Sequence, residues 1–215
     1  MTAASISTPR YRAEADPADA DQQTPLFWYP AVTTAPDDYI RSAVRIEAGA
    51  KSALDPNVPT TVQPYVAEDL PDFDLKVTGI TTVEPRRTFW DKVVILHGLR
   101  TWYDRRGELR HGGQRVSRHY FDVFRLLQLG ETAQVDRALA VDCARHARMF
   151  FNNPDFDLDH AVPGTLTLAP SPAMPERLER DYYDAMAGMI MGAIPSFADV
   201  MDAVSALELR LNESA

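Results

Sequence analysis

The chain has 215 residues, of which 45% are hydrophobic, and a formal net charge of −9 at pH 7. This length and composition suit one buried core, or one core and a small second one, and the acidity argues against a broad basic surface for nucleic acid. No apolar run is long enough to cross a bilayer and no signal-peptide pattern opens the chain, so we expect a cytoplasmic protein without a membrane partner.

The first segment, residues 1–25, combines Ala, Asp, Thr and Pro with almost no large apolar side chains. Such a segment cannot offset the entropy of ordering by burial, and we expect a disordered leader. Residues 26–30 follow as an aromatic cluster that ends at Pro30. β-prone aromatics stopped by a proline predict a short strand suited to the edge of a sheet.

The clearest strand pattern runs from Tyr39 to Ala48, where apolar and charged residues alternate. Side chains two apart share a face of a strand, so Arg45 and Glu47 are expected together on the charged face. Residues 75–83 are rich in β-branched and apolar types and predict a further strand. A short strand over residues 62–66 is weakened by its proline.

From Pro85 onward the hydrophobic pattern is helical. Serine at a helix start and glycine at a helix end mark several boundaries: Ser117 and Ser196 as N-caps, and Gly107 and Gly130 as stops. On this basis we predict helices over residues 88–103, 117–129, 131–151, 176–191 and 196–212.

Lys92 lies where the first helical pattern places packed side chains, near Phe89, Leu96 and Leu99. A lysine with a covered stem keeps its charge when an anion lies near its amine, either a protein carboxylate or a ligand phosphate. Two interpretations are open: a structural lysine whose amine reaches solvent, which is the commoner case, and a lysine that binds an anion.

Asp122 lies four residues after Arg118 and three before Arg125 on the second predicted helix. Charge pairs at these spacings are common on helix surfaces, so an ion-pair network along one helix explains Asp122 as well as a functional role does. His119 is a candidate general base, but no nucleophile pattern accompanies it, and we assign it no catalytic role.

Taken together, the segments resemble the AbiEii/AbiGii toxin family of nucleotidyltransferases. The resemblance is carried in chain order by Val44 to Ala50, Val62 to Glu68, Arg87-Thr88-Phe89-Trp90-Asp91-Lys92 with Leu96-His97, and Ser117-Arg118-His119-Tyr120-Phe121-Asp122 with Arg125-Leu126. It covers most of the chain after Pro25. The two helical motifs are specific in combination, whereas either alone is a weak signal.

Members of this family have an α+β fold, a nucleotidyltransferase-type (DNA polymerase β-like) mixed sheet followed by a helical region. The resemblance thus implies three parts: the leader over residues 1–25, a partial nucleotidyltransferase-like sheet over 26–84, and a helical region over 85–215. The family uses four motifs. A Gly-Ser helix start and an Asp-x-Asp pair hold the triphosphate and its Mg²⁺, the third motif supplies a lysine, and the fourth supplies an aspartate.

The resemblance assigns catalytic roles to Lys92, as the lysine of the third motif, and to Asp122, as the aspartate of the fourth. It implies less directly that Glu47 is a metal-side carboxylate. The nucleotide or the acceptor is expected to contact three arginines: Arg87, Arg118 and Arg45. These roles agree with general chemistry, because a lysine neutralises phosphate charge, carboxylates hold Mg²⁺, and an aspartate can orient a nucleophile.

The activity implied is magnesium-dependent transfer of a nucleotide from an NTP to an acceptor, with RNA as one candidate. The family also implies a cognate antitoxin and a setting in toxin-antitoxin or phage-defence systems. The chain departs from the family, however, because nothing before Arg45 resembles the Gly-Ser motif or the acidic pair. We therefore expect a truncated or split protein, weakly active or inactive alone, with a separately encoded N-terminal half as a further partner.

Two tripeptides have the letters of the acidic pair: Asp72-Phe73-Asp74 and Asp155-Phe156-Asp157. Neither follows a glycine-rich turn and helix, and both come after the strand that they should precede, so we interpret both as solvated loops. A similar choice concerns four arginines in the connector between the two motif helices: Arg105, Arg106, Arg110 and Arg115. They are either contacts for phosphates or parts of a solvated loop.

Three hypotheses result. The chain is part of an AbiEii-like nucleotidyltransferase; or it is a non-catalytic, degenerate binding or regulatory module of a toxin-antitoxin or phage-defence system; or it is a structural domain in which Lys92 and Asp122 have ordinary roles. The geometry of these two side chains separates the third hypothesis from the others, because an ordinary lysine and a helix-surface aspartate need not converge.

Overall fold

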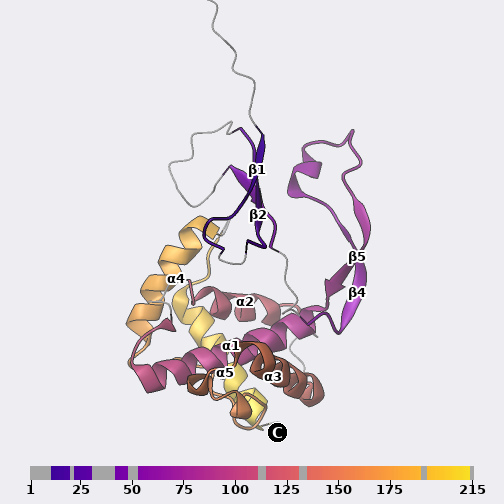
Figure 1. Cartoon of the computed structure of the whole chain (residues 1–215). Helices are drawn as coiled ribbons and strands as arrows, with labels where there is room; N and C mark the ends of the chain where they lie inside the picture. The colour runs from indigo at the N-terminus through magenta and orange to yellow at the C-terminus, as the bar shows by residue number, and fades with distance from the viewer. Residues whose placement is uncertain are drawn as a thin grey trace, which may run out of the picture. The chain divides into compact units, whose positions relative to one another are not determined.

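The computed structural model describes residues 11–19, 22–30, 42–47, 53–110, 115–130, 135–189 and 193–213. The chain forms two compact units, an N-terminal unit (Met1–Ser52) and a C-terminal unit (Ala53–Ala215). Short antiparallel strands and longer helices together make an α+β protein, which confirms the expected class (Figure 1). The two units meet between Ser52 and Ala53, whereas the parts expected from the resemblance meet at residues 25 and 84.

The N-terminal unit contains an antiparallel sheet of β1 (Arg12–Ala15), β2 (Pro25–Trp28) and β3 (Ala43–Arg45), in that order. β2 is therefore the central strand and not an edge strand. Its Leu26 side chain is buried. The strand expected from Tyr39 to Ala48 is confirmed only over β3: Ser42, Ile46 and Glu47 are described and lie outside the strand, and residues 39–41 and 48 lie outside the described residues.

Strand β1 corrects the expectation of a disordered leader over residues 1–25. All four of its side chains are exposed, so hydrophobic patterning gave no signal for it. Its order comes from main-chain pairing with β2 and from contacts to one aromatic ring. Trp28 Nε1 donates to Glu14 Oε1 at 2.7 Å, and the Arg12 guanidinium lies 4.8 Å from the Trp28 ring centroid. Residues 1–10 of the leader lie outside the described part of the chain.

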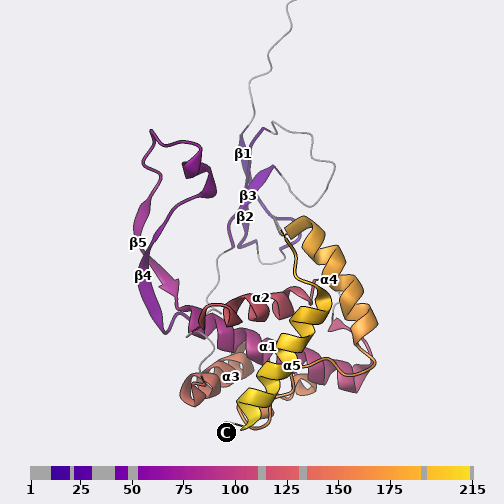
Figure 2. The ribbon, with the colours of Figure 1, turned by 180° about the vertical axis from the view of Figure 1, so that it is seen from behind.

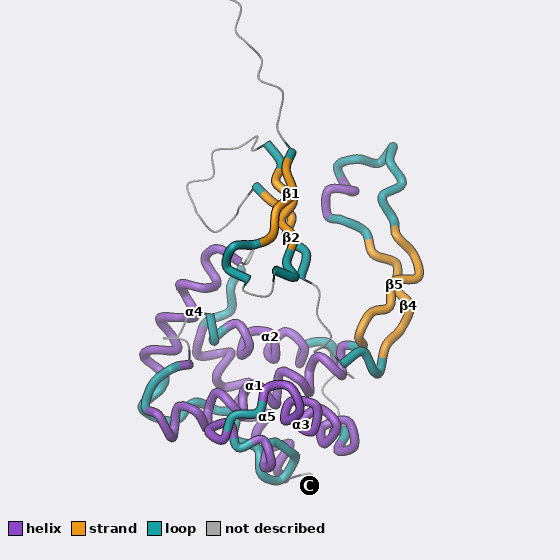
Figure 3. Tube along the Cα trace, in the orientation of Figure 1, coloured by secondary structure: helices purple, strands orange, loops and turns teal. Residues whose placement is uncertain are grey.

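The strands of the C-terminal unit are β4 (Asn57–Val62) and β5 (Val77–Val83), which form an antiparallel hairpin (orange in Figure 3). The strands expected in one partial sheet over residues 26–84 thus belong to two separate sheets. β4 ends at Val62, and Pro64 is the N-cap of a short 3₁₀ helix, Tyr65–Glu68, so residues 62–66 are mostly not a strand. Proline lacks the N–H that a strand pair needs.

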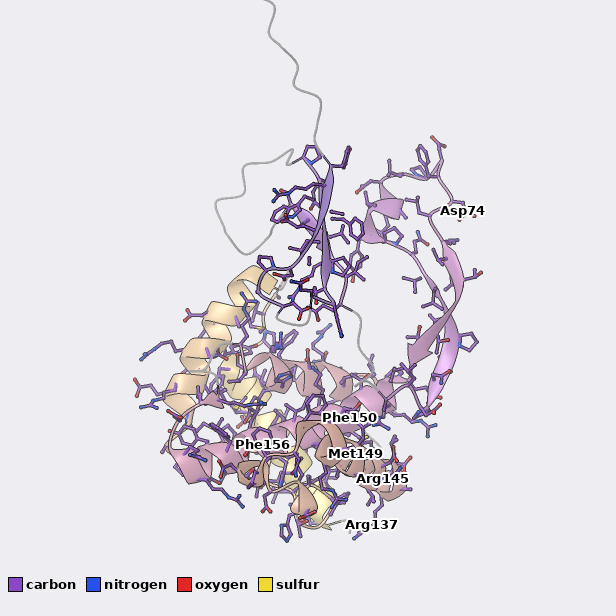
Figure 4. The ribbon with its side chains drawn as sticks, in the orientation of Figure 1. Asp74, Arg137, Arg145, Met149, Phe150 and Phe156 are labelled. Atoms are coloured by element: carbon purple, nitrogen blue, oxygen red, sulfur yellow. The ribbon has the colours of Figure 1, made fainter. Side chains whose placement is uncertain are left out.

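The acidic tripeptide at residues 72–74 lies in the loop between the 3₁₀ helix and β5, where Figure 4 labels Asp74. Phe73 is exposed, and Asp74 Oδ1 accepts a hydrogen bond from the Lys76 main-chain nitrogen at 3.2 Å. This is the local turn bond typical of aspartate. The interpretation of these residues as a solvated loop is confirmed.

The helices of the C-terminal unit are α1 (Pro85–Arg106), α2 (Arg118–Leu127), α3 (Arg137–Phe151), α4 (Pro175–Met189) and α5 (Phe197–Glu213). Gly107 ends α1 with a φ of 68°, a conformation that glycine adopts without strain. Ser196 Oγ accepts a hydrogen bond from the Asp199 nitrogen and caps α5, as expected. α3 begins later than expected because Asp136 is its cap and accepts from the Leu139 nitrogen.

α1 runs through the C-terminal unit between α2 and α3 (Figures 1 and 2). Because it is covered on several sides, its apolar residues are among the most completely buried of the described chain: Phe89, Trp90, Val93, Val94 and Leu96. A charged side chain on such a helix must find a partner on a neighbouring element or cover its stem with apolar groups. This constraint positions the candidate site.

The acidic tripeptide at residues 155–157 is not a solvated loop, which corrects that expectation. Phe156, labelled in Figure 4, is buried, and Gly98 of α1 leaves the space for its ring. A Cβ atom at residue 98 would lie 3.3 Å from a Phe156 ring carbon. Asp155 accepts from Arg106 Nε at 2.7 Å. The tripeptide therefore attaches the segment after α3 to α1.

Candidate functional site

Lys92 occupies the second turn of α1, between residues that face the core. Its stem is covered by the packing around α1, and the side chain is 23% exposed. The amine is directed to α2, the helix that packs beside this part of α1. The sequence prediction of a lysine with a packed stem is therefore correct.

Asp122 lies one turn into α2, on the edge of its buried face. Its carboxylate Oδ2 accepts a hydrogen bond from Lys92 Nζ at 2.6 Å, and the side chain is 37% exposed. No ion pair of Asp122 with Arg118 or Arg125 is found among the described residues, so the expected alternative of a network along the helix surface is not what forms. The partner of Asp122 comes from a different helix.

The Lys92–Asp122 pair has the geometry of a charge-assisted hydrogen bond, since its 2.6 Å separation is at the short end of the range for ammonium and carboxylate. Both groups keep contact with solvent. Asp122 retains a second carboxylate oxygen, and an ammonium has three hydrogens to donate. The two motif residues therefore converge at one partly open point, where each has capacity for a further hydrogen bond. An ion pair between two helices also occurs in a structural domain, so the hypothesis of ordinary roles for these residues stays a prediction.

His119 joins this pair, because Lys92 Nζ lies 3.2 Å from His119 Nδ1. Burial lowers the pKa of His119 to about 3, and the positive charges of Lys92, Arg118 and Arg110 contribute to the shift. The imidazole is therefore neutral at physiological pH. Sequence reasoning assigned no role to this histidine. The signal that was available is its spacing, since residues three apart on a helix share a face and Asp122 is three residues after His119.

Arg87 does not have the position expected of a nucleotide- or acceptor-binding residue. Its side chain is 1% exposed. Nε donates to both carboxylate oxygens of Asp91 at 3.1 Å, and Nη1 donates to Asp142 Oδ2 at 2.8 Å and to the Asp55 carbonyl at 3.1 Å. Burial alone would lower the pKa of Arg87, but the bonds and charges of its two carboxylate partners outweigh it and raise the pKa. Arg87 holds α1 to α3 and to the segment before β4.

Arg118 remains a candidate for contact with a ligand. It is exposed in the first turn of α2, and its charge acts on His119, so it lies close to the Lys92 and Asp122 pair. Guanidinium groups bind phosphate through paired hydrogen bonds. Its predicted role in binding the nucleotide or the acceptor stays a prediction.

Arg45 and Glu47 belong to the N-terminal unit, and their contacts are described within that unit alone. Arg45 Nη1 donates to Glu47 Oε1 at 2.9 Å, and Arg45 Nε lies 3.2 Å from Asp16 Oδ2. Asp16 is 3% exposed, although it belongs to the segment expected to be disordered. Arg45 therefore bridges two carboxylates within its own unit. The roles of Arg45 and Glu47 toward a nucleotide or a metal stay predictions.

The residues in the described ranges do not fit a resident Mg²⁺ site. Mg²⁺ prefers an octahedral set of oxygen ligands, with carboxylates among them. Across these ranges, no three His, Cys, Asp or Glu side chains gather where they could hold a metal ion. Glu47 carries a bond from Arg45, and Asp122 carries one from Lys92.

The connector arginines mostly bind other parts of the protein. Arg105 donates to the Pro154 carbonyl, Arg106 to Asp155, and the Arg110 guanidinium lies 4.7 Å from the Phe156 ring centroid. These contacts connect the end of α1 to the segment after α3. They do not support the hypothesis that this connector is a phosphate-binding loop.

None of the described helices is both long and apolar enough to cross a membrane. A family model described as "Nucleotidyl transferase AbiEii toxin, Type IV TA system" matches residues 2–205 of the chain. Searches of curated proteins and of solved structures found no match. The match includes residues 2–25, which we expected to be a disordered leader outside the resemblance.

Proposed function

Because the chain belongs to the AbiEii nucleotidyl transferase toxin family, we propose that it carries the phosphate-binding side of a nucleotidyltransferase site. The reaction is transfer of a nucleotide from an NTP to an acceptor, with RNA as the candidate acceptor. The single observation that supports this best is the convergence of Lys92 and Asp122 at 2.6 Å from two different helices. A cognate antitoxin is the partner that a toxin family suggests.

Lys92 is proposed to donate a hydrogen bond to an oxygen of the triphosphate and to offset the charge that develops on the leaving phosphates. Asp122 is proposed to fix the lysine through Oδ2 and to accept from the attacking hydroxyl, or to orient it, through its other oxygen. Magnesium is proposed to arrive with the substrate, since NTPs are bound as magnesium complexes in phosphoryl-transfer enzymes. The exposed Arg118 is proposed as an additional phosphate contact.

Transfer is proposed to need a Gly-Ser turn and an Asp-x-Asp pair, for which the sequence before Arg45 has no match. We propose that a separately encoded polypeptide supplies them and that this chain alone is weakly active or inactive. The DNA immediately upstream of the gene is then expected to encode both motifs in a nearby reading frame. An upstream region without them would contradict this part of the proposal.

The test is transfer of labelled nucleotide to total RNA by this chain, alone and mixed with the polypeptide that carries the two motifs. We expect little transfer by the chain alone and clear transfer by the mixture. Lys92→Met is expected to lower transfer by at least about a hundredfold, the cost of one lost transition-state donor. Lys76→Met, in the loop before β5, is the matched control and should leave transfer unchanged. Equal transfer by the Lys92 and Lys76 variants would refute the proposal.

The second candidate is a non-catalytic binding or regulatory module of a toxin-antitoxin or phage-defence system. It is favoured by the bond between Arg45 and Glu47, which occupies the carboxylate expected on the metal side. This candidate predicts nucleotide binding without transfer, both alone and in the mixture. Robust transfer by the chain alone would exclude it and would also show that the two missing motifs are not needed.

A further inference from the structure

The amine of Lys92 is held by two acceptors that follow each other closely on α2. Lys92 Nζ lies 2.6 Å from Asp122 Oδ2 and 3.2 Å from His119 Nδ1. An ammonium group can only donate hydrogen bonds, so His119 Nδ1 must be the acceptor and its ring proton must be on Nε2. The contact therefore defines the tautomer of the histidine.

The charge of the histidine is equally defined by its surroundings. The ring is partly buried and faces the positive charges of Lys92 on α1, Arg118 on α2 and Arg110 after α1. Burial, followed by these three charges, lowers the pKa of His119 to about 3. A protonated ring would lose the acceptor for Lys92 and would add a fourth positive charge at this point. The ring is therefore uncharged near neutral pH.

A neutral acceptor has a specific advantage beside Lys92. Asp122 already offsets one of the positive charges at this point, so a second carboxylate would remove a further unit of the positive charge that attracts a triphosphate. An imidazole takes one hydrogen of the ammonium without adding charge. With two of its three hydrogens held, the ammonium presents the third in one direction.

We propose that His119 is a positioning residue that directs the third hydrogen of the Lys92 ammonium toward a phosphate oxygen of the bound nucleotide. This inference rests on the proposed function, because it takes an NTP as the ligand of Lys92. It assigns to His119 neither contact with the substrate nor proton transfer. Its action is entirely through Lys92.

The first test measures the histidine itself in the full chain and needs no activity. NMR of the imidazole nitrogens should show a proton on Nε2 of His119 and none on Nδ1. The ring should stay neutral as the pH is lowered to about 4, because its pKa is about 3. A proton on Nδ1, or a charged ring at neutral pH, would overturn the inference even if the chain transfers nucleotide. The expected tautomer in a chain that never binds nucleotide would refute the proposed function alone.

The second test is titration with a magnesium–nucleoside triphosphate complex of the full chain mixed with the polypeptide that carries the Gly-Ser and Asp-x-Asp motifs. His119→Leu removes the acceptor and is expected to weaken binding about tenfold, the value of one misdirected charge-assisted bond. His119→Asn places an amide oxygen near the position of Nδ1, which restores the hydrogen bond, and should bind within about threefold of the wild-type chain. His119→Asp keeps an acceptor but adds a negative charge, and should bind more weakly than His119→Asn.

A matched control is His146→Leu on α3, where the ring contacts Phe150 and not the site. This variant should bind the triphosphate as the wild-type chain does. If His119→Leu and His119→Asn lose affinity equally while both remain folded, the acceptor role is wrong. If either variant does not fold, the NMR measurement on the wild-type chain still decides the question.

Discussion

Arg87→Met tests the structural role assigned to the most deeply buried charge of the C-terminal unit. Arg87 is 1% exposed and is bonded to Asp91, Asp142 and the Asp55 carbonyl. Removing one partner of a fully buried ion pair costs about 3–5 kcal/mol. Asp91 and Asp142 are 36% and 39% exposed, so water can solvate them after the substitution. We therefore expect a smaller loss of about 2–3 kcal/mol in the free energy of unfolding.

Urea unfolding followed by circular dichroism measures this loss. The urea midpoint should fall, while the slope of the unfolding free energy against urea concentration stays the same. An unchanged slope means that the folded and unfolded states are as compact as before and that only the stability has changed. Arg86→Met is the matched control, because Arg86 is the neighbouring residue and its side chain is 48% exposed and pairs with Glu84. That change should cost less than about 0.5 kcal/mol. Equal midpoints for the two variants would refute the reasoning, and Arg87 would again be available for a ligand.

The two acidic tripeptides give a paired prediction: Phe156→Ala should cost about 3 kcal/mol or more, as expected for a buried ring, and the exposed Phe73→Ala less than about 0.5 kcal/mol in the same urea assay. Burial lowers the pKa of His97 and of His119 in the folded chain, so the unfolded chain binds more protons below about pH 6.5. The contribution of these two histidines to the free energy of unfolding should be complete above that pH. It should be lost as the pH falls toward their pKa values in the folded chain, about 3 for His119, and equal urea midpoints at neutral pH and near pH 5 would contradict this. Asn212 Oδ1 accepts hydrogen bonds from the main-chain nitrogens of Gly164 and Leu166, between α3 and α4, so Asn212→Ala should speed exchange of these two amide hydrogens. Unchanged exchange would show that Asn212 does not stabilise this segment.

The helices could be predicted from the sequence because their signals are local. A helical period of apolar residues, Gly107 after α1 and Ser196 before α5 each act within a few residues of the boundary that they define. Strand β1 could not be found in this way. Its exposed side chains carry no apolar pattern, and its order depends on pairing with β2.

The site could be predicted only in part for the same reason. Lys92 and Asp122 were identified through family motifs, but their 30-residue separation in sequence hides the bond that joins them. His119 has no nucleophile pattern around it in the sequence, and its contact with Lys92 on another helix appears only in the structure. The resemblance implies a ligand contact for Arg87, and the sequence does not show the Asp142 carboxylate, 55 residues away, that binds it. Contacts between helices decided each of these cases.

The most direct test of the central claim is chemical footprinting of the lysine amines. The chain has three lysines, Lys51, Lys76 and Lys92, so acylation at each can be followed separately by mass spectrometry. In the mixture with the polypeptide that carries the Gly-Ser and Asp-x-Asp motifs, addition of a magnesium–nucleoside triphosphate complex at about millimolar concentration, in the range of ordinary enzyme affinities, should lower the reactivity of Lys92 and leave Lys76 unchanged. Equal reactivity of Lys92 with and without the nucleotide would contradict the claim that this lysine binds its phosphates.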